Sequence, residues 1–419
     1  MTAARHVLTP TVAIVGAGPA GLTAAATLAR RLGGDVLVLD REQAAGGIPR
    51  HSDHTGYGLR DLHRVMTGPT YAQHLAAEAT AAGATIRTRA TVTGWSGTRS
   101  LEVTSPQGLF RVEPRAIVLA TGARERPRPA RFIPGTRPSG IYTTGHLQNL
   151  VHLQHRSVGN RAVVVGAEPV SWSAVLTLRK AGCRTVLMTT GHASPESYAA
   201  FHLPGRLLLR VPVATRTRVT RIIGQRRLEA VEIEDLATGR RRTVACDTLI
   251  LTGDWIPDHE VARTAGLDMD PATRGPLVDT ALRTSRPGVF AAGNLLHAVD
   301  TADIAALGGR HAAHQVLAWL DGESTPQPAV PIIADAPFRW VAPGLLRVGA
   351  PAPPRHRLLL WSDELVRLPR VTVHQNGREL TRRTLPWPAS PGRVFRVPWS
   401  MLSTVDHEGG PVHLGIART

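Results

Sequence analysis

A glycine-rich bend at residues 15–21 constrains the fold of this 419-residue chain more than any other feature. The bend follows a short apolar run at residues 11–15 and opens an alanine-rich stretch at residues 20–32, which is the pattern of a buried strand followed by a helix. Residues 36–40 form the next expected strand. These segments predict a βαβ unit of about 30 residues, the building block of a parallel sheet.

The glycines of this bend have the spacing of a dinucleotide-binding turn. Gly16 suits the tight turn, Gly18 allows the backbone to approach a pyrophosphate, and Gly21 allows the helix to pack on the strand. The N-terminus of the helix supplies oriented N–H groups for phosphates. Asp40 ends the next strand, where a carboxylate accepts hydrogen bonds from a ribose. A glycine-rich turn without a ligand is the alternative, but it does not account for all of these features together.

The same unit occurs a second time. Residues 162–165, 170–181 and 185–189 repeat the order of strand, helix and strand. Hydrophobic residues make up 42% of the chain, which excludes intrinsic disorder as its main state. We therefore predict the fold class α/β, with two Rossmann-like dinucleotide-binding domains, the first of them discontinuous, and a small C-terminal all-β domain.

Three further segments favour FAD over NAD as the ligand of the first unit. They are Gly46-Gly47, Ala120-Thr121-Gly122 at the end of a buried strand, and the late strand that ends at Gly293-Asn294. Residues 10–320 resemble the two-dinucleotide-fold flavoproteins, the pyridine nucleotide-disulfide oxidoreductase-like superfamily that contains glutathione and thioredoxin reductases. In that superfamily the corresponding segments wrap FAD, so the resemblance implies an FAD cofactor.

The resemblance also implies which residues contact FAD. Val92 is expected beside the adenine through its backbone, and Asn294 replaces the aspartate that contacts the ribityl chain. The helix expected at residues 301–320 either points its N-terminus at the flavin or is only capped by Asp300-Thr301; the two interpretations are compatible. The full set of expected FAD contacts is Gly16, Gly18, Pro19, Ala20, Gly21, Asp40, Arg41, Gly47, Val92, Thr121, Gly122, Gly293 and Asn294.

The second unit usually binds NAD(P)H in this superfamily, but here its motif is damaged. Gly166 remains at the turn, whereas Glu168 and Ser171 replace the second and third glycines. A carboxylate beside a pyrophosphate is repelled by about 1 kcal/mol or more. The next strand ends at Thr189-Thr190 and offers no acid for a ribose. We expect ordinary NAD(P)H binding to be lost, with binding in another pose as the alternative.

The chain lacks the redox thiols of the disulfide reductases. Its two cysteines, Cys183 and Cys246, form no CxxC motif, which excludes thiol–disulfide chemistry, and no metal site is predicted. A polar segment, residues 50–54, follows Gly46-Gly47 instead and passes the flavin if the superfamily path holds. His51 and His54 are the candidate catalytic residues for proton or substrate handling. A capped loop without chemistry is the alternative.

Charge and composition limit the classes of binding partner that we predict for the chain. The formal charge of +17 comes from scattered arginines, because Lys180 is the only lysine, and aromatic residues are only 4%, so nucleic-acid binding is not predicted. An anionic small molecule or cofactor suits this charge better. There is no apolar run long enough for a membrane span and no room for a signal peptide before residue 11, which predicts a cytoplasmic protein.

The predicted domains follow the repeated units and a later change in composition. Residues 1–135 and 275–322 form the FAD-binding domain, residues 136–274 the second domain with a degenerate NAD(P)-binding site, and residues 332–419 the C-terminal β domain. Residues 323–331 carry three prolines and are expected to be a linker. Four tryptophans, alternating apolar residues and turns such as the one expected at Asn376-Gly377 mark the β domain. Core packing explains those tryptophans better than an interface does.

Several segments resemble a narrower group. They are residues 46–51 with 67–71, residues 165–168, and residues 292–297. They look like the FAD subunits of opine oxidases, hydrogen cyanide synthase and dye-linked proline dehydrogenases, and like the flavoproteins that accompany glycerol-3-phosphate dehydrogenase. The resemblance implies the FAD subunit of a heteromeric dehydrogenase or oxidase that acts on an amine, amino acid or hydroxy acid, and its partner would be a second flavoprotein or an electron-transfer subunit. The alternatives are an NAD(P)H-dependent flavin reductase and a non-catalytic FAD-binding scaffold subunit.

Overall fold

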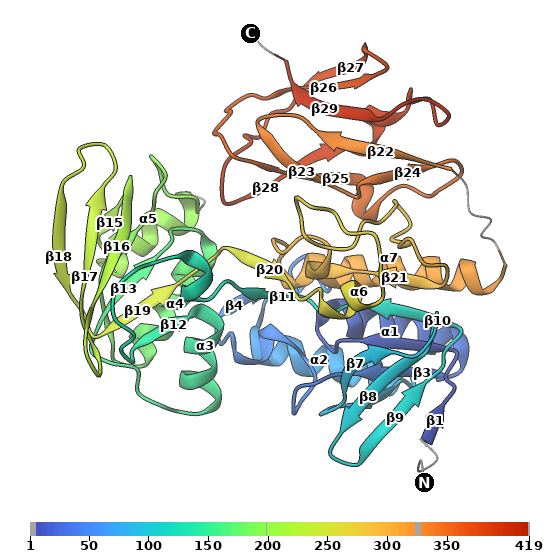
Figure 1. The fold of residues 1–419 in the computed structure, drawn as a ribbon, viewed down its shortest axis with the longest axis horizontal. Coiled ribbons are helices and arrows are strands. Elements are labelled where there is room, and N and C mark those ends of the chain that lie inside the picture. Colours follow the sequence, from blue (N-terminus) through green and yellow to red (C-terminus); the bar gives the residue numbers. More distant parts are fainter. Residues whose placement is uncertain (1–5, 198, 323–327, 418–419) are drawn as a thin grey trace. The chain divides into compact units, whose positions relative to one another are not determined.

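A computed structural model describes residues 6–197, 199–322 and 328–417 (Figure 1). The chain divides into two compact units. Unit 1 comprises Met1–Arg50, Gly56–Arg124 and Pro257–Thr419, and unit 2 comprises His51–Thr55 and Glu125–Ile256. The predicted boundaries of three domains are finer than this division and stay a prediction.

Unit 1 contains a five-stranded parallel sheet in the order β21-β10-β2-β3-β6. Its strands are β2 (Val12–Val15), β3 (Val36–Leu39), β6 (Thr85–Arg87), β10 (Ala116–Leu119) and β21 (Val289–Ala291). The helices of this region are α1 (Pro19–Leu32), α2 (Gly68–Ala81) and α7 (Ala302–Leu320). The expected strand–helix–strand order of the first unit is thereby confirmed.

Helices α1 and α7 pack backbone against backbone. A Cβ on Gly309 of α7 would lie 2.0 Å from the carbonyl oxygen of Ala20 in α1. The late part of the chain therefore joins the same core as the N-terminal βαβ unit, as expected for a discontinuous domain.

Smaller elements complete this part of the fold. An antiparallel extension has the order β1-β9-β8-β7, with β1 (His6–Leu8) parallel to β9. Its other strands are β7 (Thr91–Trp95), β8 (Leu101–Ser105) and β9 (Gly108–Val112). The short elements of unit 1 are β5 (Met66–Thr67), α6 (Glu260–Thr264) and η4 (Gly293–Leu295). Four further short elements include residues of both units: η1 (Ile48–His51), β4 (Thr55–Tyr57), β11 (Ala123–Glu125) and β20 (Trp255–Pro257).

Unit 2 repeats the parallel architecture in the order β12-β19-β13-β14-β15. These strands are β12 (Ile141–Thr143), β13 (Arg161–Val165), β14 (Arg184–Thr189), β15 (Val213–Ala214) and β19 (Thr248–Leu251). An antiparallel sheet adds β16 (Thr217–Gly224), β17 (Leu228–Asp235) and β18 (Arg241–Ala245). Its helices are η2 (Arg128–Arg131), α3 (Thr144–Gln148), the π-helix η3 (Asn149–Leu153), α4 (Pro169–Lys180) and α5 (Ala199–Leu208).

The C-terminal part of unit 1 is rich in strands, as predicted. One sheet has the order β24-β22-β29-β26-β27 and the other β23-β25-β28. The strands are β22 (Ala329–Ala334), β23 (Phe338–Ala342), β24 (Leu345–Arg347), β25 (Arg357–Ser362), β26 (Arg370–Gln375), β27 (Arg378–Thr384), β28 (Val394–Pro398) and β29 (Val412–Ile416), with the short helices η5 (Pro354–His356) and η6 (Trp399–Leu402).

Two local predictions in this region had different outcomes. The expected turn at Asn376-Gly377 joins β26 to β27, and both residues have positive φ, 51° and 76°. The expected linker at 323–331 was wrong at its end, because β22 begins at Ala329 and buries Val330 at 4% exposure. The alternation of apolar residues there outweighs the proline content; residues 323–327 lie outside the described part of the chain.

Candidate functional site

The first glycine turn combines two packed positions with one open position. Gly16 has φ +108°, and a Cβ there would lie 2.3 Å from the carbonyl oxygen of Ala120. A Cβ on Gly21 would lie 1.9 Å from the Gly16 oxygen. A Cβ on Gly18, in contrast, would meet no atom of the described residues within 4 Å. Gly16 and Gly21 are therefore required for packing of the chain on itself, whereas the space beside Gly18 is open to a ligand.

The N-terminus of α1 adds donors at this open position. Gly18 is the N-cap residue, Pro19 is the first residue of the helix, and the first turn contains no acidic side chain. The first helical bond runs from the Leu22 N–H to the Gly18 oxygen at 2.9 Å, so the N–H of Ala20 precedes the hydrogen-bonded ladder. This end of the helix dipole favours an anion such as a pyrophosphate.

Asp40 braces the glycine turn and keeps acceptor capacity. Its Oδ2 accepts a hydrogen bond from the Ala17 N–H at 2.5 Å, and its Oδ1 accepts one from the Glu42 N–H at 2.8 Å. A carboxylate has about four lone-pair directions, so each oxygen of the half-buried Asp40 has capacity for a ribose hydroxyl as well.

Asp258 joins three of the residues expected at the cofactor, and the sequence reasoning did not find it. Its carboxylate pairs with Arg41 at 2.7 Å and with Arg124 at 2.6 Å. Its backbone accepts a hydrogen bond from Thr121 Oγ1 at 2.7 Å and donates one to the Gly122 oxygen at 2.9 Å. Burial raises the pKa of Asp258, while the two guanidinium groups oppose that shift. Arg41 is therefore held by a protein carboxylate, with only part of its guanidinium available to a ligand.

Gly47 lies against the first glycine turn, and Val92 lies on an edge strand; their expected FAD contacts stay a prediction. The N–H of Gly46 donates to the Ala17 oxygen at 2.7 Å, and a Cβ on Gly47 would lie 2.9 Å from the Gly18 α-carbon. The loop therefore packs directly on the first glycine turn. Val92 lies on β7, the last strand in the order of its sheet, where one backbone edge is not used in the strand pairing described.

The late strand returns to the same turn. A Cβ on Gly293 would lie 2.8 Å from the Cβ of Ala20, which places this glycine against the first turn of α1. Asn294 uses its amide on the backbone of Asp300, accepting from the N–H at 2.8 Å and donating to the oxygen at 3.0 Å. One N–H and one lone pair of Asn294 remain for a ribityl hydroxyl, so its expected FAD contact stays a prediction.

The residues around the first turn fit FAD. An open position beside Gly18, the N-terminus of α1 and the carboxylate of Asp40 lie together in unit 1, and they match a pyrophosphate and a ribose. When bound, FAD supplies two-electron redox chemistry at its isoalloxazine ring. Gly18, the N-terminus of α1 and Asp40 would bind and orient the dinucleotide.

The side chain of Glu168 fills the space at the second glycine turn. A Cβ on Gly166 would lie 2.7 Å from Glu168 Oε2, and one on Gly253 would lie 2.3 Å from Glu168 Oε1. The same Oε1 accepts a hydrogen bond from Thr252 Oγ1 at 2.8 Å, and that hydroxyl lies 2.6 Å from Ser171 Oγ. Glu168 is also the N-cap residue of α4. A carboxylate thus occupies the place at which the first turn is open to a phosphate.

A second carboxylate lies near the first. The N–H of Ser197 donates to the Ala167 oxygen at 3.0 Å, which repeats the bond that fixes the loop over the first turn. The preceding residue, Glu196, accepts from Thr190 Oγ1 at 2.9 Å and is only 8% exposed. Burial, and the nearby charge of Glu168, raise the pKa of Glu196 to about 7. Two acidic groups therefore lie in this region, and the expected loss of ordinary NAD(P)H binding stays a prediction.

Arg131 neutralises part of this acidic region from within unit 2. Its Nη1 donates to the Thr252 oxygen at 2.9 Å and its Nη2 donates to the Gly253 oxygen at 2.7 Å. Burial lowers the pKa of Arg131, and the charge of Glu168 opposes that shift. The guanidinium group thus holds the backbone on which the Glu168 carboxylate rests.

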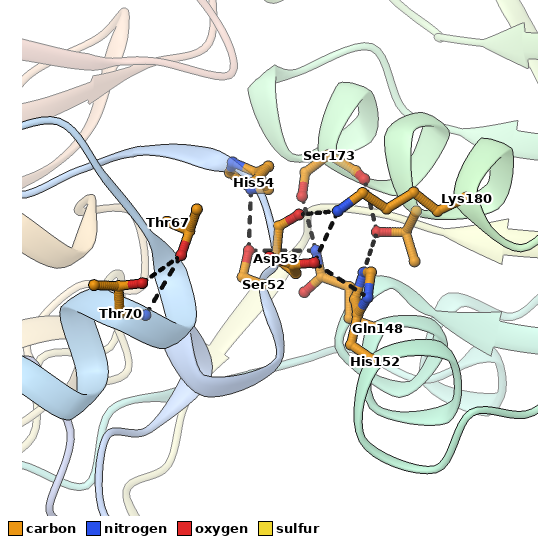
Figure 2. Close-up of polar contacts among 10 residues, drawn as sticks. Ser52, Asp53, His54, Thr67, Thr70, Gln148, His152, Ser173 and Lys180 are labelled. Carbon is orange, nitrogen blue, oxygen red and sulfur yellow. Dashed lines mark hydrogen bonds and ion pairs between the residues drawn. The ribbon is translucent and has the colours of Figure 1, made fainter.

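The histidine segment, defined as His51–Thr55, belongs to unit 2 (Figure 2). His54 lies with Nε2 3.0 Å from Ser52 Oγ and with Nδ1 2.8 Å from the Thr55 oxygen. Asp53 accepts a hydrogen bond from Lys180 Nζ at 2.8 Å. A Cβ on Gly145, in the first turn of α3, would lie 3.8 Å from His51 Nε2 and 3.4 Å from Glu125 Oε2. The expected FAD contacts lie in unit 1, so a catalytic role for either histidine stays a prediction.

Thiol chemistry has no support in the structure. Cys183 and Cys246 are both buried, and burial raises their pKa values to about 11 and about 12. Within the described ranges, no group of three or more His, Cys, Asp or Glu side chains is arranged to hold a metal ion. Among the same residues, no helix combines the length and the apolar character that crossing a membrane requires.

Comparisons with known proteins agree with this geometry. An opine oxidase subunit of Agrobacterium tumefaciens (strain Ach5) is 29% identical over 348 residues, which cover 74% of this chain and 66% of that protein. The HcnB subunit of hydrogen cyanide synthase from Pseudomonas aeruginosa is 25% identical over 333 residues, which cover 73% of this chain and 70% of that protein. The chain thus spans about two thirds of the length of these relatives.

Solved structures and a family model complete the comparison. Thioredoxin reductase of T. acidophilum has a similar fold, with a TM-score of 0.63 and 22% identity over 75% of this chain and 99% of that one. The model of the pyridine nucleotide-disulphide oxidoreductases matches residues 10–309. Residues 10–309 include both dinucleotide folds of the chain. The chain belongs to the pyridine nucleotide-disulphide oxidoreductase family, and its first dinucleotide fold fits FAD.

Proposed function

We propose that the chain is the FAD-binding subunit of a heteromeric dehydrogenase or oxidase that oxidises an amine, an amino acid or a hydroxy acid. The observation that carries this proposal is the position of the Glu168 carboxylate, held by Thr252 at the N-terminus of α4. If the second dinucleotide fold of the chain repels NAD(P)H, the flavin takes its electrons from another donor. A reduced organic substrate is that donor in our proposal.

The names of the relatives support the heteromeric part of the proposal. Both the opine oxidase protein and the hydrogen cyanide synthase protein are named as subunits. We therefore propose a partner polypeptide, a second flavoprotein or an electron-transfer subunit, that exchanges electrons with the FAD of this chain. The first substrates to test are opines, with other N-substituted amino acids and 2-hydroxy acids beside them.

We propose that the histidine segment handles the proton in this oxidation. Removal of a hydride equivalent from an amine or an alcohol also releases a proton, and an imidazole accepts a proton near neutral pH. His51 and His54 are the candidates, and each lies in a segment fastened by hydrogen bonds in unit 2.

One experiment separates this proposal from its alternatives. The tagged chain is isolated from its native host, its visible spectrum is recorded, and co-purifying polypeptides are identified by mass spectrometry. The complex is then mixed without oxygen, in separate stopped-flow runs, with NADH, NADPH, octopine, nopaline, proline and lactate. We expect one of the organic substrates to bleach the flavin and the pyridine nucleotides to leave it oxidised.

The other outcomes favour the alternatives. Rapid bleaching by NADH or NADPH overturns the proposal and supports an NAD(P)H-dependent flavin reductase. A yellow protein that no substrate and no co-purified partner reduces or reoxidises supports a non-catalytic scaffold subunit. The variant Glu168→Gln removes the charge of this side chain with little change in its shape, and it tests whether that charge excludes NADH.

A further inference from the structure

The histidine segment is held in unit 2 by a buried polar contact. Ser52 is 3% exposed, and its Oγ accepts a hydrogen bond from Gln148 Nε2 at 3.4 Å. The same amide nitrogen donates to Ser173 Oγ at 2.7 Å, and Gln148 and Ser173 are 3% and 7% exposed. One glutamine at the end of α3 thus joins the segment to α4 inside the protein (Figure 2).

The chemistry of these groups fixes the direction of each hydrogen bond. The Thr55 carbonyl only accepts, so His54 Nδ1, 2.8 Å from it, carries a proton. Nε2 of the neutral imidazole is then an acceptor, and Ser52 Oγ, 3.0 Å away, donates to it. The lone pairs of Ser52 remain for the N–H of Gln148. Donation therefore runs in one direction, from Gln148 to Ser52, to His54, to the Thr55 oxygen.

A second contact fastens the same segment from α4. Lys180 Nζ donates to Asp53 Oδ2 at 2.8 Å and to the Asp53 backbone oxygen at 2.9 Å, and His152 Nδ1 lies 3.9 Å from that Oδ2. The hydrogen bond from Lys180 is the main cause that lowers the pKa of Asp53. Lys180 is the single lysine of the sequence, so this ammonium is chemically unique among the side chains.

We propose that Gln148 and Lys180 are positioning residues for the histidine segment: Lys180 holds its backbone, and Gln148, acting through Ser52, holds His54 as the Nδ1–H tautomer. The importance of this arrangement for catalysis rests on the proposed function, in which the segment handles a proton. With both ring nitrogens engaged, His54 orients the segment. We assign the proton exchange to His51, whose Nε2 lies 3.8 Å from the position that a Cβ on Gly145 would take in the first turn of α3.

The tautomer is tested by nitrogen NMR on the holoenzyme labelled with ¹⁵N-histidine, with the His54 signals identified by their loss in His54→Gln. We expect Nδ1 to carry the proton in the wild type. Gln148→Glu keeps the shape but makes the group an acceptor, so Ser52 donates to it and a proton appears on His54 Nε2. Ser173→Ala is the matched control, because it removes the other partner of Gln148 and leaves the Ser52–His54 bond in place.

The lysine contact is tested by hydrogen exchange and by amine modification, both read by mass spectrometry. We expect amides of the histidine segment to exchange at least tenfold faster in Lys180→Met, and Lys180→Arg to restore slow exchange. Asp53→Asn is expected to raise the rate of Lys180 acetylation by acetic anhydride at least threefold. Glu78→Gln, which breaks a surface ion pair on α2, is the control.

The result that overturns the inference is a proton on His54 Nε2 in the wild type, a Gln148→Glu spectrum like that of the wild type, or unchanged exchange in Lys180→Met. None of these readouts needs a substrate. If no organic substrate reduces the flavin, the proposed function fails while the positioning contacts still stand. If the spectra contradict the tautomer, the inference fails whatever the substrate is.

Discussion

Glu168 Oε1 accepts a hydrogen bond from Thr252 Oγ1 at 2.8 Å, which fixes a carboxylate over the second glycine turn. Gly18 stands at the corresponding position of the first turn, and a Cβ there would meet no atom within 4 Å in the part of the chain that the structure describes. Two copies of one βαβ architecture thus differ in whether the anion at the helix N-terminus comes from a ligand or from the chain.

Glu168→Gly is expected to give unit 2 measurable affinity for NADH. At 4 Å, two unit charges near a protein surface repel by about 4 kcal/mol, so removing the carboxylate strengthens binding by at least tenfold. The measurement is a titration of protein fluorescence with NADH, beside Glu168→Gly combined with Glu196→Gln, which removes both acidic groups. If both variants bind NADH as weakly as the wild type, the carboxylates are not what excludes the dinucleotide.

Gly18→Ala is expected to weaken FAD binding, whereas Gly21→Ala is expected to destabilise the fold. Gly18 has φ −81°, which alanine adopts, so Gly18→Ala leaves the stability of the flavin-free protein within about 1 kcal/mol and weakens FAD binding at least tenfold. Gly21→Ala places a Cβ 1.9 Å from the Gly16 oxygen and is expected to cost about 2 kcal/mol or more. Urea unfolding and FAD fluorescence quenching measure the two effects. Unchanged FAD affinity in Gly18→Ala would mean that the phosphates lie elsewhere.

Glu196→Gln is expected to stabilise the protein at high pH only. The pKa of Glu196 is raised from 4.5 to about 7, so its contribution to stability is fully present below pH 4.5 and is lost as the pH rises through 7. At pH 8 the variant should be more stable than the wild type by on the order of 1–3 kcal/mol, and near pH 4.5 the difference should vanish. Urea midpoints at both pH values check this. Glu113→Gln, at an exposed position, controls for the change in net charge.

The local architecture was predictable because it depends on neighbours in sequence. The helix expected at residues 20–32 is observed as Pro19–Leu32, since glycines bound it at both ends and its alanines face a buried sheet. The hairpin at Asn376-Gly377 follows from the positive φ values that this pair tolerates. Patterns of this kind are complete within a few residues.

The candidate site could be predicted from the sequence only where all of its residues belong to one motif. Asp258 meets Thr121 from 137 positions away, and Gln148 meets Ser52 from 96 positions away. No periodicity or spacing links such pairs, because tertiary packing alone brings them together. The sequence indicated that Glu168 would repel a phosphate, but the hydrogen bond that holds its carboxylate over Gly166 depends on Thr252 of another strand.

Tyr71→Phe is expected to destabilise unit 1 by about 1–3 kcal/mol at neutral pH. Tyr71 is fully buried and donates to Asp61 Oδ2 at 2.6 Å. Burial raises the pKa of Asp61, so the stability that this carboxyl contributes is present at low pH and is lost as the pH rises. Without the Tyr71 hydroxyl this loss of stability grows. The decrease in the free energy of unfolding caused by Tyr71→Phe should therefore be larger at pH 7 than at pH 4. Urea unfolding at both pH values measures it, with Tyr142→Phe in unit 2 as control; an equal effect at both pH values would contradict the explanation.

The side chain of Glu168 has a consequence for how the protein responds to cofactor supply. Ligand binding stabilises a fold by mass action, so unit 1 gains stability only to the extent that FAD is abundant. The carboxylate of Glu168 is covalently present at a constant effective concentration, and Thr252 holds it at the N-cap residue of α4. In a cell starved of riboflavin, newly made chains would therefore be weakest around Gly18, and degradation should begin in that half while the other half stays folded.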